Sequence, residues 1–114
     1  MANIGGNITG VIQKKTTKQN EIGESEITWA DAFSPKGFLD LQSGDSDYSK
    51  HKTKLEESTH VFLCAFHSGI YALADQDTRL ICKGMVYDIL LIDDPMELNE
   101  QLEIYLRKVG AWNG

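Results

Sequence analysis

Short stretches of alternating hydrophobic and polar residues fill the first third of the chain. "ITGVIQKKTT" at 8–17 is rich in β-branched residues, which predicts a first strand. "ITWADAF" at 27–33 alternates in the same way, and a Ser-Pro-Lys-Gly turn separates it from "FLDLQ" at 38–42. We therefore predict a β-hairpin over 27–42, preceded by a polar connection at 18–26.

Longer apolar segments follow in the second half of the chain. "HVFLCAF" at 60–66 is almost entirely apolar, which is typical of a strand that is buried on both faces or lies in an interface. Residues 67–78 are consistent with either a helical turn or a loop. "RLICKG" at 79–84 and "MVYDILLID" at 85–93 predict two strands joined around Gly84, where we expect a tight turn or a bulge.

The segment after Asp94 fits two patterns. As a helix it would begin with Asp94 as the cap and Pro95 in the first turn. Its apolar stripe would then be Leu98, Leu102, Tyr105 and Val109. As a strand, alternation over 101–108 places every second residue on one face. We favour a short helical turn at 95–99 followed by a strand at 101–108.

These elements predict a mainly β protein. Six or seven short strands with no helix–strand alternation indicate a small antiparallel β-barrel, closed or nearly closed, with long loops and a short helical turn. A length of 114 residues suits one domain. We assign a flexible N-terminal arm to 1–7, the β-barrel domain to 8–109, an inserted polar loop to 43–59 and a C-terminal tail to 110–114.

Charge and composition narrow the possible functions. The chain has 11 basic and 17 acidic residues and a net charge of −6, which argues against binding DNA through its phosphates. No apolar run reaches the roughly 18 residues that a membrane helix needs, and the N-terminus has no leader-like pattern. We expect a cytoplasmic protein without membrane contacts, in which Cys64 and Cys82 are buried, reduced thiols.

A metal site or a thiol enzyme is the first chemical hypothesis that the sequence raises. His60, Cys64 and His67 have the spacing of part of a zinc site. In a strand, however, His60 and Cys64 share a face and His67 points to the other, and no second ligand pair follows. An apolar strand also raises the pKa of a thiol, which makes it a poor nucleophile. We expect no metal here.

A calcium loop is the second chemical hypothesis. Asp45, Asp47 and Ser49 occupy alternate positions of "DSDYSKHKTKLE", but Lys50 stands where the sharp turn requires glycine. Nucleotide-binding and hydrolase motifs are absent from the sequence. We expect no catalytic residues, no cofactor and no small-molecule substrate.

Interaction features are better supported. Trp112 is a large aromatic residue near the C-terminus, and it either docks on a partner or packs back on its own barrel. The candidate partner contacts in the polar loop are Asp45, Asp47, Tyr48, Lys50, Lys52 and Lys54. An alternative is a barrel that binds single-stranded nucleic acid through Tyr48, Tyr71 and Trp29, but the net charge opposes it.

Four segments taken in order resemble one family. They are "VIQKKTT", "EITWAD", "RLICKGMVYDILLIDDP" and "LEIYLRKVG". They resemble the small head–tail connector proteins of tailed phages, also called head-closure or adaptor proteins, and most of all the connector-like proteins of PBSX-type Bacillus prophages. The 43–59 loop and the "GAWNG" tail depart from that family's pattern.

The resemblance implies a structural protein of the virion. It implies a small β-barrel whose copies form a homo-oligomeric ring beneath the portal protein, close the filled head and dock a tail-completion or tail-terminator protein. Genomic DNA would pass through the ring without sequence-specific contacts. The protein would first reside in the host bacterial cytoplasm and then at the head–tail interface of the virion.

Overall fold

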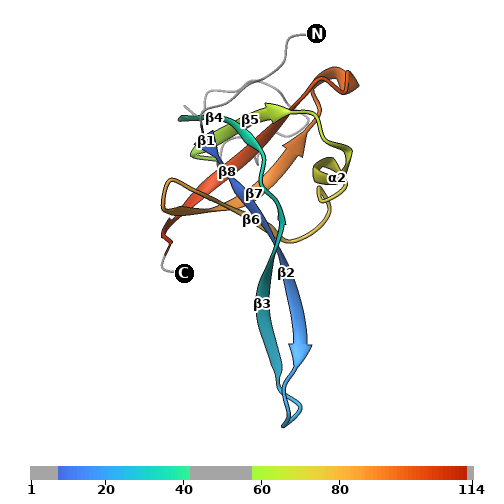
Figure 1. Ribbon diagram of the computed structural model, residues 1–114, viewed down its shortest axis with the longest axis vertical. Helices are drawn as coiled ribbons and strands as arrows, with labels where there is room; N and C mark the ends of the chain where they lie inside the picture. Colours follow the sequence, from blue (N-terminus) through green and yellow to red (C-terminus); the bar gives the residue numbers. More distant parts are fainter. Residues whose placement is uncertain (1–7, 42–57, 113–114) are drawn as a thin grey trace.

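One curled antiparallel sheet dominates the computed structural model, which describes residues 8–41 and 58–112 (Figure 1). Its eight described strands lie in the order β1-β4-β5-β8-β7-β6-β2-β3. The first four are β1 (Ile8–Thr9), β2 (Val11–Gln19), β3 (Ser25–Phe33) and β4 (Lys36–Leu41). The others are β5 (His60–Ala65), β6 (Thr78–Cys82), β7 (Met85–Asp93) and β8 (Gln101–Ala111).

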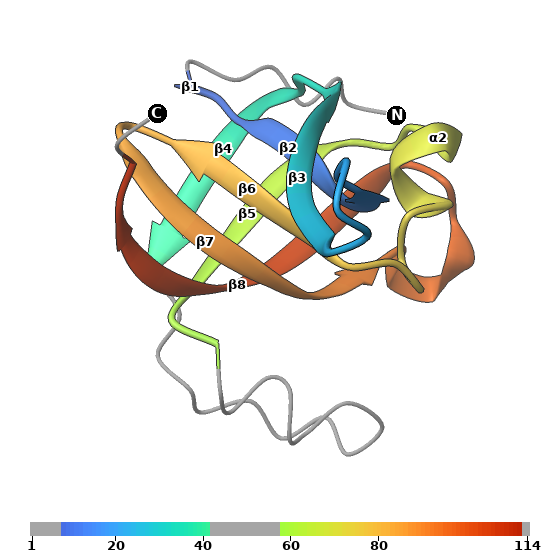
Figure 2. The same ribbon diagram turned by 90° about the horizontal axis from the view of Figure 1, so that it is seen from below.

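The curl of the sheet gives a half-barrel (Figure 2). Every pairing between described strands is antiparallel, which confirms the predicted mainly β, barrel-like fold. The strands β1 and β3 stand at the two ends of the order and do not pair with each other. The barrel is therefore open along one side, between these two edge strands.

The concave side of the half-barrel holds the hydrophobic core. Its most deeply buried side chains come from four strands and are Ile12, Phe62, Leu80, Leu102, Ile104 and Leu106. In β8 the residues between them, Glu103 and Tyr105, are only partly buried, so this segment has the period of a strand. Full burial of each large apolar side chain stabilises the fold by about 1.5–3 kcal/mol.

The predicted hairpin over 27–42 is wrong. β3 pairs with β2 instead, and β4 pairs with β1 and β5. The polar connection contains the true turn: Asn20 Oδ1 accepts hydrogen bonds from the backbone N–H groups of Ile22 and Glu24, and Gly23 has a positive φ of 86°. The residues that flank this turn continue the two strands, although they are polar.

Two glycines are required by the geometry of the sheet. Lys83 and Gly84 both have positive φ, 52° and 74°, which is the backbone of a two-residue turn between β6 and β7. Gly84 therefore forms the predicted tight turn. Gly37 lies where β4 meets β5, and a Cβ there would collide with the backbone carbonyl of Leu63.

Two short helical segments interrupt the strands within residues 8–41 and 58–112. They are α2 (Ser68–Tyr71) and the 3-10 turn η2 (Pro95–Glu97), which confirms the turn predicted at 95–99. Asp94 does not cap the first turn of η2, because its Oδ1 accepts a hydrogen bond from the backbone N–H of Asn99. Neither segment in the described part of the chain has the length and apolar composition needed to cross a lipid bilayer.

Candidate partner-binding surface

A two-stranded arm projects from the half-barrel. It is the outer part of the β2–β3 hairpin, which we define as residues 16–28, and it accounts for much of the 51 Å long axis of the molecule (Figure 1). Nearly every arm residue is exposed, including Ile22 and Ile27 with exposed fractions of 78% and 59%. The arm therefore contributes almost nothing to the hydrophobic core.

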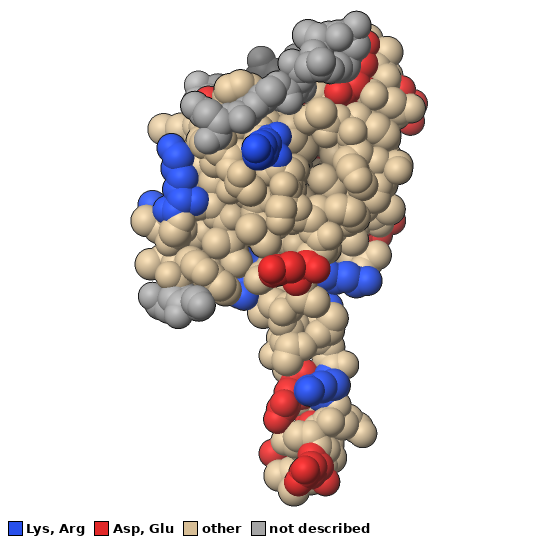
Figure 3. All heavy atoms as spheres, viewed as in Figure 1, with Lys and Arg blue, Asp and Glu red and all other residues tan. Residues whose placement is uncertain are grey.

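The arm has ordered local contacts and a polarised charge distribution. The Thr16 and Thr28 hydroxyls hydrogen-bond across the two strands. All charged residues of β2 are lysines (Lys14, Lys15 and Lys18), whereas those of β3 are acidic (Glu26 and Asp31). Figure 3 shows acidic side chains gathered toward the far end of the arm. The hairpin thus has one cationic and one anionic strand, and the arm itself contains Lys18 of the first and Glu26 of the second.

Both long edges of the arm are unpaired among the described strands. β3 ends the strand order, so its outer edge has no neighbour within residues 8–41 and 58–112. β2 pairs with β6 only over its first residues, up to Lys14, and the Lys15 N–H then donates to the carbonyl of Asp77 at 3.0 Å. Unpaired edges of this kind are common docking sites for another strand.

A row of polar side chains crosses the outer face of the sheet at the base of the arm. Its members come from five neighbouring strands and are Asp31, Gln13, Arg79, Asp88 and Arg107. Gln13 Nε2 donates to Asp31 at 2.8 Å, and Arg79 Nε donates to Gln13 Oε1 at 2.8 Å. These contacts join β3, β2 and β6 directly below the arm.

Arg79 also lies between two aromatic rings. Its guanidinium carbon is 4.2 Å from the ring centroid of Trp29 and 5.2 Å from that of Trp112. The backbone N–H of Trp112 donates to the carbonyl of Gly84 at 2.8 Å, and Trp112 keeps 36% of its surface exposed. Trp112 therefore packs on its own sheet and still presents part of its ring outward.

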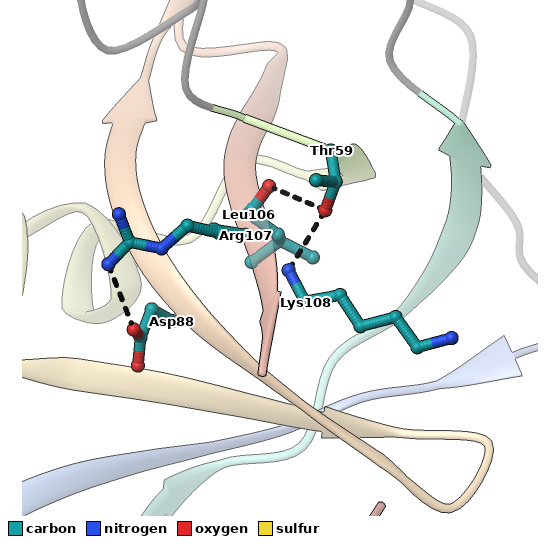
Figure 4. A network of polar contacts seen from close by, with 5 residues as sticks. All are labelled: Thr59, Asp88, Leu106, Arg107 and Lys108. Atoms are coloured by element: carbon teal, nitrogen blue, oxygen red, sulfur yellow. Dashed lines mark hydrogen bonds and ion pairs between the residues drawn. The ribbon is translucent and has the colours of Figure 1, made fainter. Parts of the chain in front are cut away.

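The far end of the polar row is tied to the start of β5 (Figure 4). Arg107 forms an ion pair with Asp88 at 3.2 Å, and both side chains are nearly half exposed. On the other side of β8, Thr59 Oγ1 accepts from the backbone N–H of Lys108 at 2.9 Å and contacts the carbonyl of Leu106. Exposed ion pairs contribute about 0–1 kcal/mol, so this pair adds little stability, and Thr59 fixes the start of β5 to the backbone of β8.

The histidines and the thiol of the metal hypothesis have other structural roles. His67 Nδ1 accepts from the backbone N–H groups of Gly69 and Ile70 and so caps α2. His60 Nδ1 hydrogen-bonds to the hydroxyl of Thr59, and burial is the main cause that lowers the pKa of His60. Burial raises the pKa of Cys64 to about 11, which disfavours the reactive thiolate.

No metal-ligating cluster is assembled within the described ranges. Residues 8–41 and 58–112 contain no group of three or more His, Cys, Asp or Glu side chains suited to a metal ion. Two of the aromatic residues proposed for nucleic-acid stacking lie on different elements: Tyr71 ends α2, and Trp29 in β3 already contacts Arg79.

Most of the predicted partner contacts lie outside the described residues. Asp45, Asp47, Tyr48, Lys50, Lys52 and Lys54 belong to this group, and Trp112 is the only predicted contact within the described part. The sequence reasoning missed the polar row. A signal was present, because a two-residue turn at Lys83 and Gly84 fixes Arg79 opposite Asp88 by register.

Comparison with known families identifies the chain. The model of the phage head completion protein family matches residues 9–109, which is most of its length. The chain belongs to the phage head completion protein family. No curated protein sequence matches it.

Membership places this head completion protein among the structural proteins of phage virions. The family's role in completing the head implies contact with other head or tail proteins. The match confirms the predicted head-closure class, and it concerns the family as a whole rather than the PBSX-type members within it. The matched range contains the whole arm and all five residues of the polar row.

Proposed function

We propose that the protein assembles as a ring beneath the portal protein and there joins the filled head to the tail. The family match over residues 9–109 is the observation that carries this proposal. A ring requires heterologous contacts, in which two different patches of each copy meet. The two edges of the arm that are unpaired among the described strands, one formed by β2 and one by β3, are two different patches on one molecule.

The charge of the protein supports a role beside moving DNA. A net charge of −6 gives a ring of copies a strongly negative field, which repels phosphates and lets the genome pass without being held. We propose that the portal protein binds one side of the ring and that a tail-completion or tail-terminator protein binds the other. The protein would work without catalysis, by contact alone.

Co-purification with the portal protein of the same phage tests this proposal. The two proteins are expressed together, the portal is captured by an affinity tag, and the complex is imaged by electron microscopy. We expect additional ring-shaped density below the portal and stoichiometric amounts of the head completion protein. Capture of the portal alone, under conditions in which both proteins are folded and soluble, would contradict the proposal.

A further inference from the structure

The backbone of the arm determines which hydrogen-bonding groups face outward. The Asn20 N–H donates to the carbonyl of Glu24 at 2.8 Å, so this pair is a hydrogen-bonded pair of the β2–β3 ladder. Hydrogen-bonded and non-hydrogen-bonded pairs alternate along an antiparallel ladder. The next outward-facing residues on β3 are therefore Ser25 and Ile27, which stand opposite Gln19 and Thr17 in the same chain.

An independent contact confirms this alternation. Lys15 has the same parity as Thr17, and its N–H points away from β3 to the carbonyl of Asp77. Thr17 and Gln19 therefore also direct their backbone groups away from β3, toward the second edge of the arm. Each edge of the arm thus has two alternate residues, Ser25 and Ile27 on β3 and Thr17 and Gln19 on β2, that direct their backbone groups outward. The N–H and C=O groups of these residues have no strand partner among the described residues.

We propose that the arms of neighbouring copies pair edge to edge, with β3 of one copy adding to β2 of the next. This inference rests on the ring in the proposed function and names the surfaces that build it. In copies related by rotation about an axis along the arm, β2 of the neighbour runs antiparallel to β3. Ile27 then meets Thr17 of the neighbouring copy, and both residues direct their backbone groups into the shared edge.

The same register places oppositely charged side chains of neighbouring copies opposite each other. Glu26 lies opposite Lys18 within one arm, so in the paired arms each Glu26 lies between its own Lys18 and the Lys18 of the next copy. Opposite charges directly across strands are favourable, and like charges are unfavourable. A β3–β3 contact that pairs Ser25 with Ile27 of the other copy would place Glu26 opposite Glu26, and a β2–β2 contact that pairs Thr17 with Gln19 would place Lys18 opposite Lys18. The charges therefore favour head-to-tail pairing, which is the heterologous contact that a ring needs.

A disulfide trap tests the contact between copies. Lys18→Cys and Glu26→Cys are made in separate chains and mixed, because both changes in one chain would react internally. In the proposed edge these positions form a non-hydrogen-bonded pair with Cα atoms about 4.5 Å apart, within the range that a disulfide bridges. The native thiols, Cys64 and Cys82, are buried and do not compete. We expect the mixed disulfide to exceed either homodisulfide severalfold.

A matched control separates register from simple exposure. The control is Glu21→Cys, because residue 21 lies in the exposed turn of the arm and no residue of the neighbouring copy stands opposite it in the proposed edge. Its mixture with Lys18→Cys should give only background crosslinking. Predominance of the Glu26→Cys homodisulfide, or equal yields from both mixtures, would overturn the inference.

A charge swap provides a second readout that does not depend on thiol chemistry. Lys18→Glu alone and Glu26→Lys alone each place like charges at every contact between copies, so each variant should lose association. An equimolar mixture of the two restores opposite charges between copies, although each arm keeps its internal like pair. Recovery of the oligomer in the mixture supports pairing between chains, and no recovery overturns it.

The trap is run on the free protein at increasing concentration and on the complex with the portal. A portal complex that forms without the 18–26 disulfide overturns this inference and leaves the proposed function intact. A disulfide in the free protein without any portal complex supports the inference and contradicts the proposed function. Absence of both overturns both.

Discussion

The half-barrel and the arm of this head completion protein are built from the same kind of strand but are stabilised differently. The half-barrel has a core of fully buried apolar side chains, among them Phe62, Ile104 and Leu106 at 0% exposure. The arm, residues 16–28, has no buried side chain and keeps Ile22 and Ile27 exposed. The half-barrel is thus stabilised by its core, and the arm by its backbone ladder, a few hydroxyl contacts and the Asn20 turn.

This difference indicates what the arm is for. An isolated two-stranded hairpin is at most marginally stable in water, so an extension of this length adds little to the stability of the fold. Two unpaired edges with opposite charges are suited to contacts with another chain. Changes in the half-barrel should therefore alter folding, whereas changes in the arm should alter assembly.

The largest expected effect is the loss of a core aromatic side chain. Phe62 lies in β5 between β4 and β8 and is fully buried. Phe62→Ala should lower the free energy of unfolding by about 3–5 kcal/mol, because it removes apolar contacts and leaves a cavity. Ile27→Ala in the arm is the matched control and should change that free energy by about 0.5 kcal/mol or less. Urea unfolding measures both, and equal losses would show that the arm shares the core.

The sequence predicted the half-barrel better than the arm for a physical reason. Burial imposes a pattern: apolar residues alternate in β8, and positive φ at Gly84 favours glycine, so the strands at 79–93 and 101–108 were correctly predicted. The arm is exposed on both faces and carries no such pattern. Its polar residues at 18–26 therefore suggested a connection, and β3 was paired with the wrong neighbour.

The candidate surface was predictable only in part. Trp112 was singled out as an aromatic residue that either docks on a partner or packs on its own barrel, but its contact with Arg79 joins segments that are remote in sequence. The pairing of β2 with β6, which brings Gln13 to Arg79, is likewise a long-range contact that no local pattern specifies. The other predicted partner contacts lie in 42–57, outside the described residues.

Replacement of Arg79 should lower the stability of the fold by removing contacts just below the arm. Arg79→Met keeps much of the side-chain volume but loses the contacts with Trp29 and Trp112 and leaves Gln13 Oε1 without its donor. The expected loss in the free energy of unfolding is about 1–2 kcal/mol. Trp29 and Trp112 are the only 2 tryptophans in the chain, so the substitution should also shift the intrinsic tryptophan fluorescence.

The matched control for Arg79→Met is Arg107→Met. It removes a nearly half-exposed ion pair with Asp88 in the same polar row. This variant should lose about 0–1 kcal/mol. A loss equal to that of Arg79→Met would mean that the aromatic contacts of Arg79 add nothing.

Shortening the arm should have a smaller effect on stability. Replacing residues 17–27 with Asn-Gly joins Thr16 to Thr28 through a two-residue hairpin turn and retains the hydrogen-bonded pair at the base. The free energy of unfolding should change by about 1 kcal/mol or less, because no buried side chain is removed. Sedimentation should show that the shortened protein no longer self-associates at concentrations where the full-length chain does. A shortened chain that fails to fold would refute the separation of the two regions.

The smallest expected effect is a pH dependence that belongs to the half-barrel alone. Burial and the nearby Lys108 lower the pKa of His60, whereas the unfolded chain keeps an ordinary value of about 6.5. As the pH falls below about 6.5, the unfolded state binds a proton that folded His60 binds less readily, so stability falls. His60→Gln should reduce this loss between about pH 7 and pH 5.5, as measured by urea unfolding at each pH.

Two further variants locate the origin of this pH effect. Lys108→Met should reduce the loss in part, because it removes the cation that opposes protonation of His60, whereas Lys14→Met, an exposed lysine of β2, should leave it unchanged. Shortening the arm removes residues 17–27, which contain no histidine. The shortened protein should therefore keep the full pH dependence. A weaker dependence in that variant would mean that the arm and the environment of His60 are energetically coupled, and the two regions would then have to be treated as one.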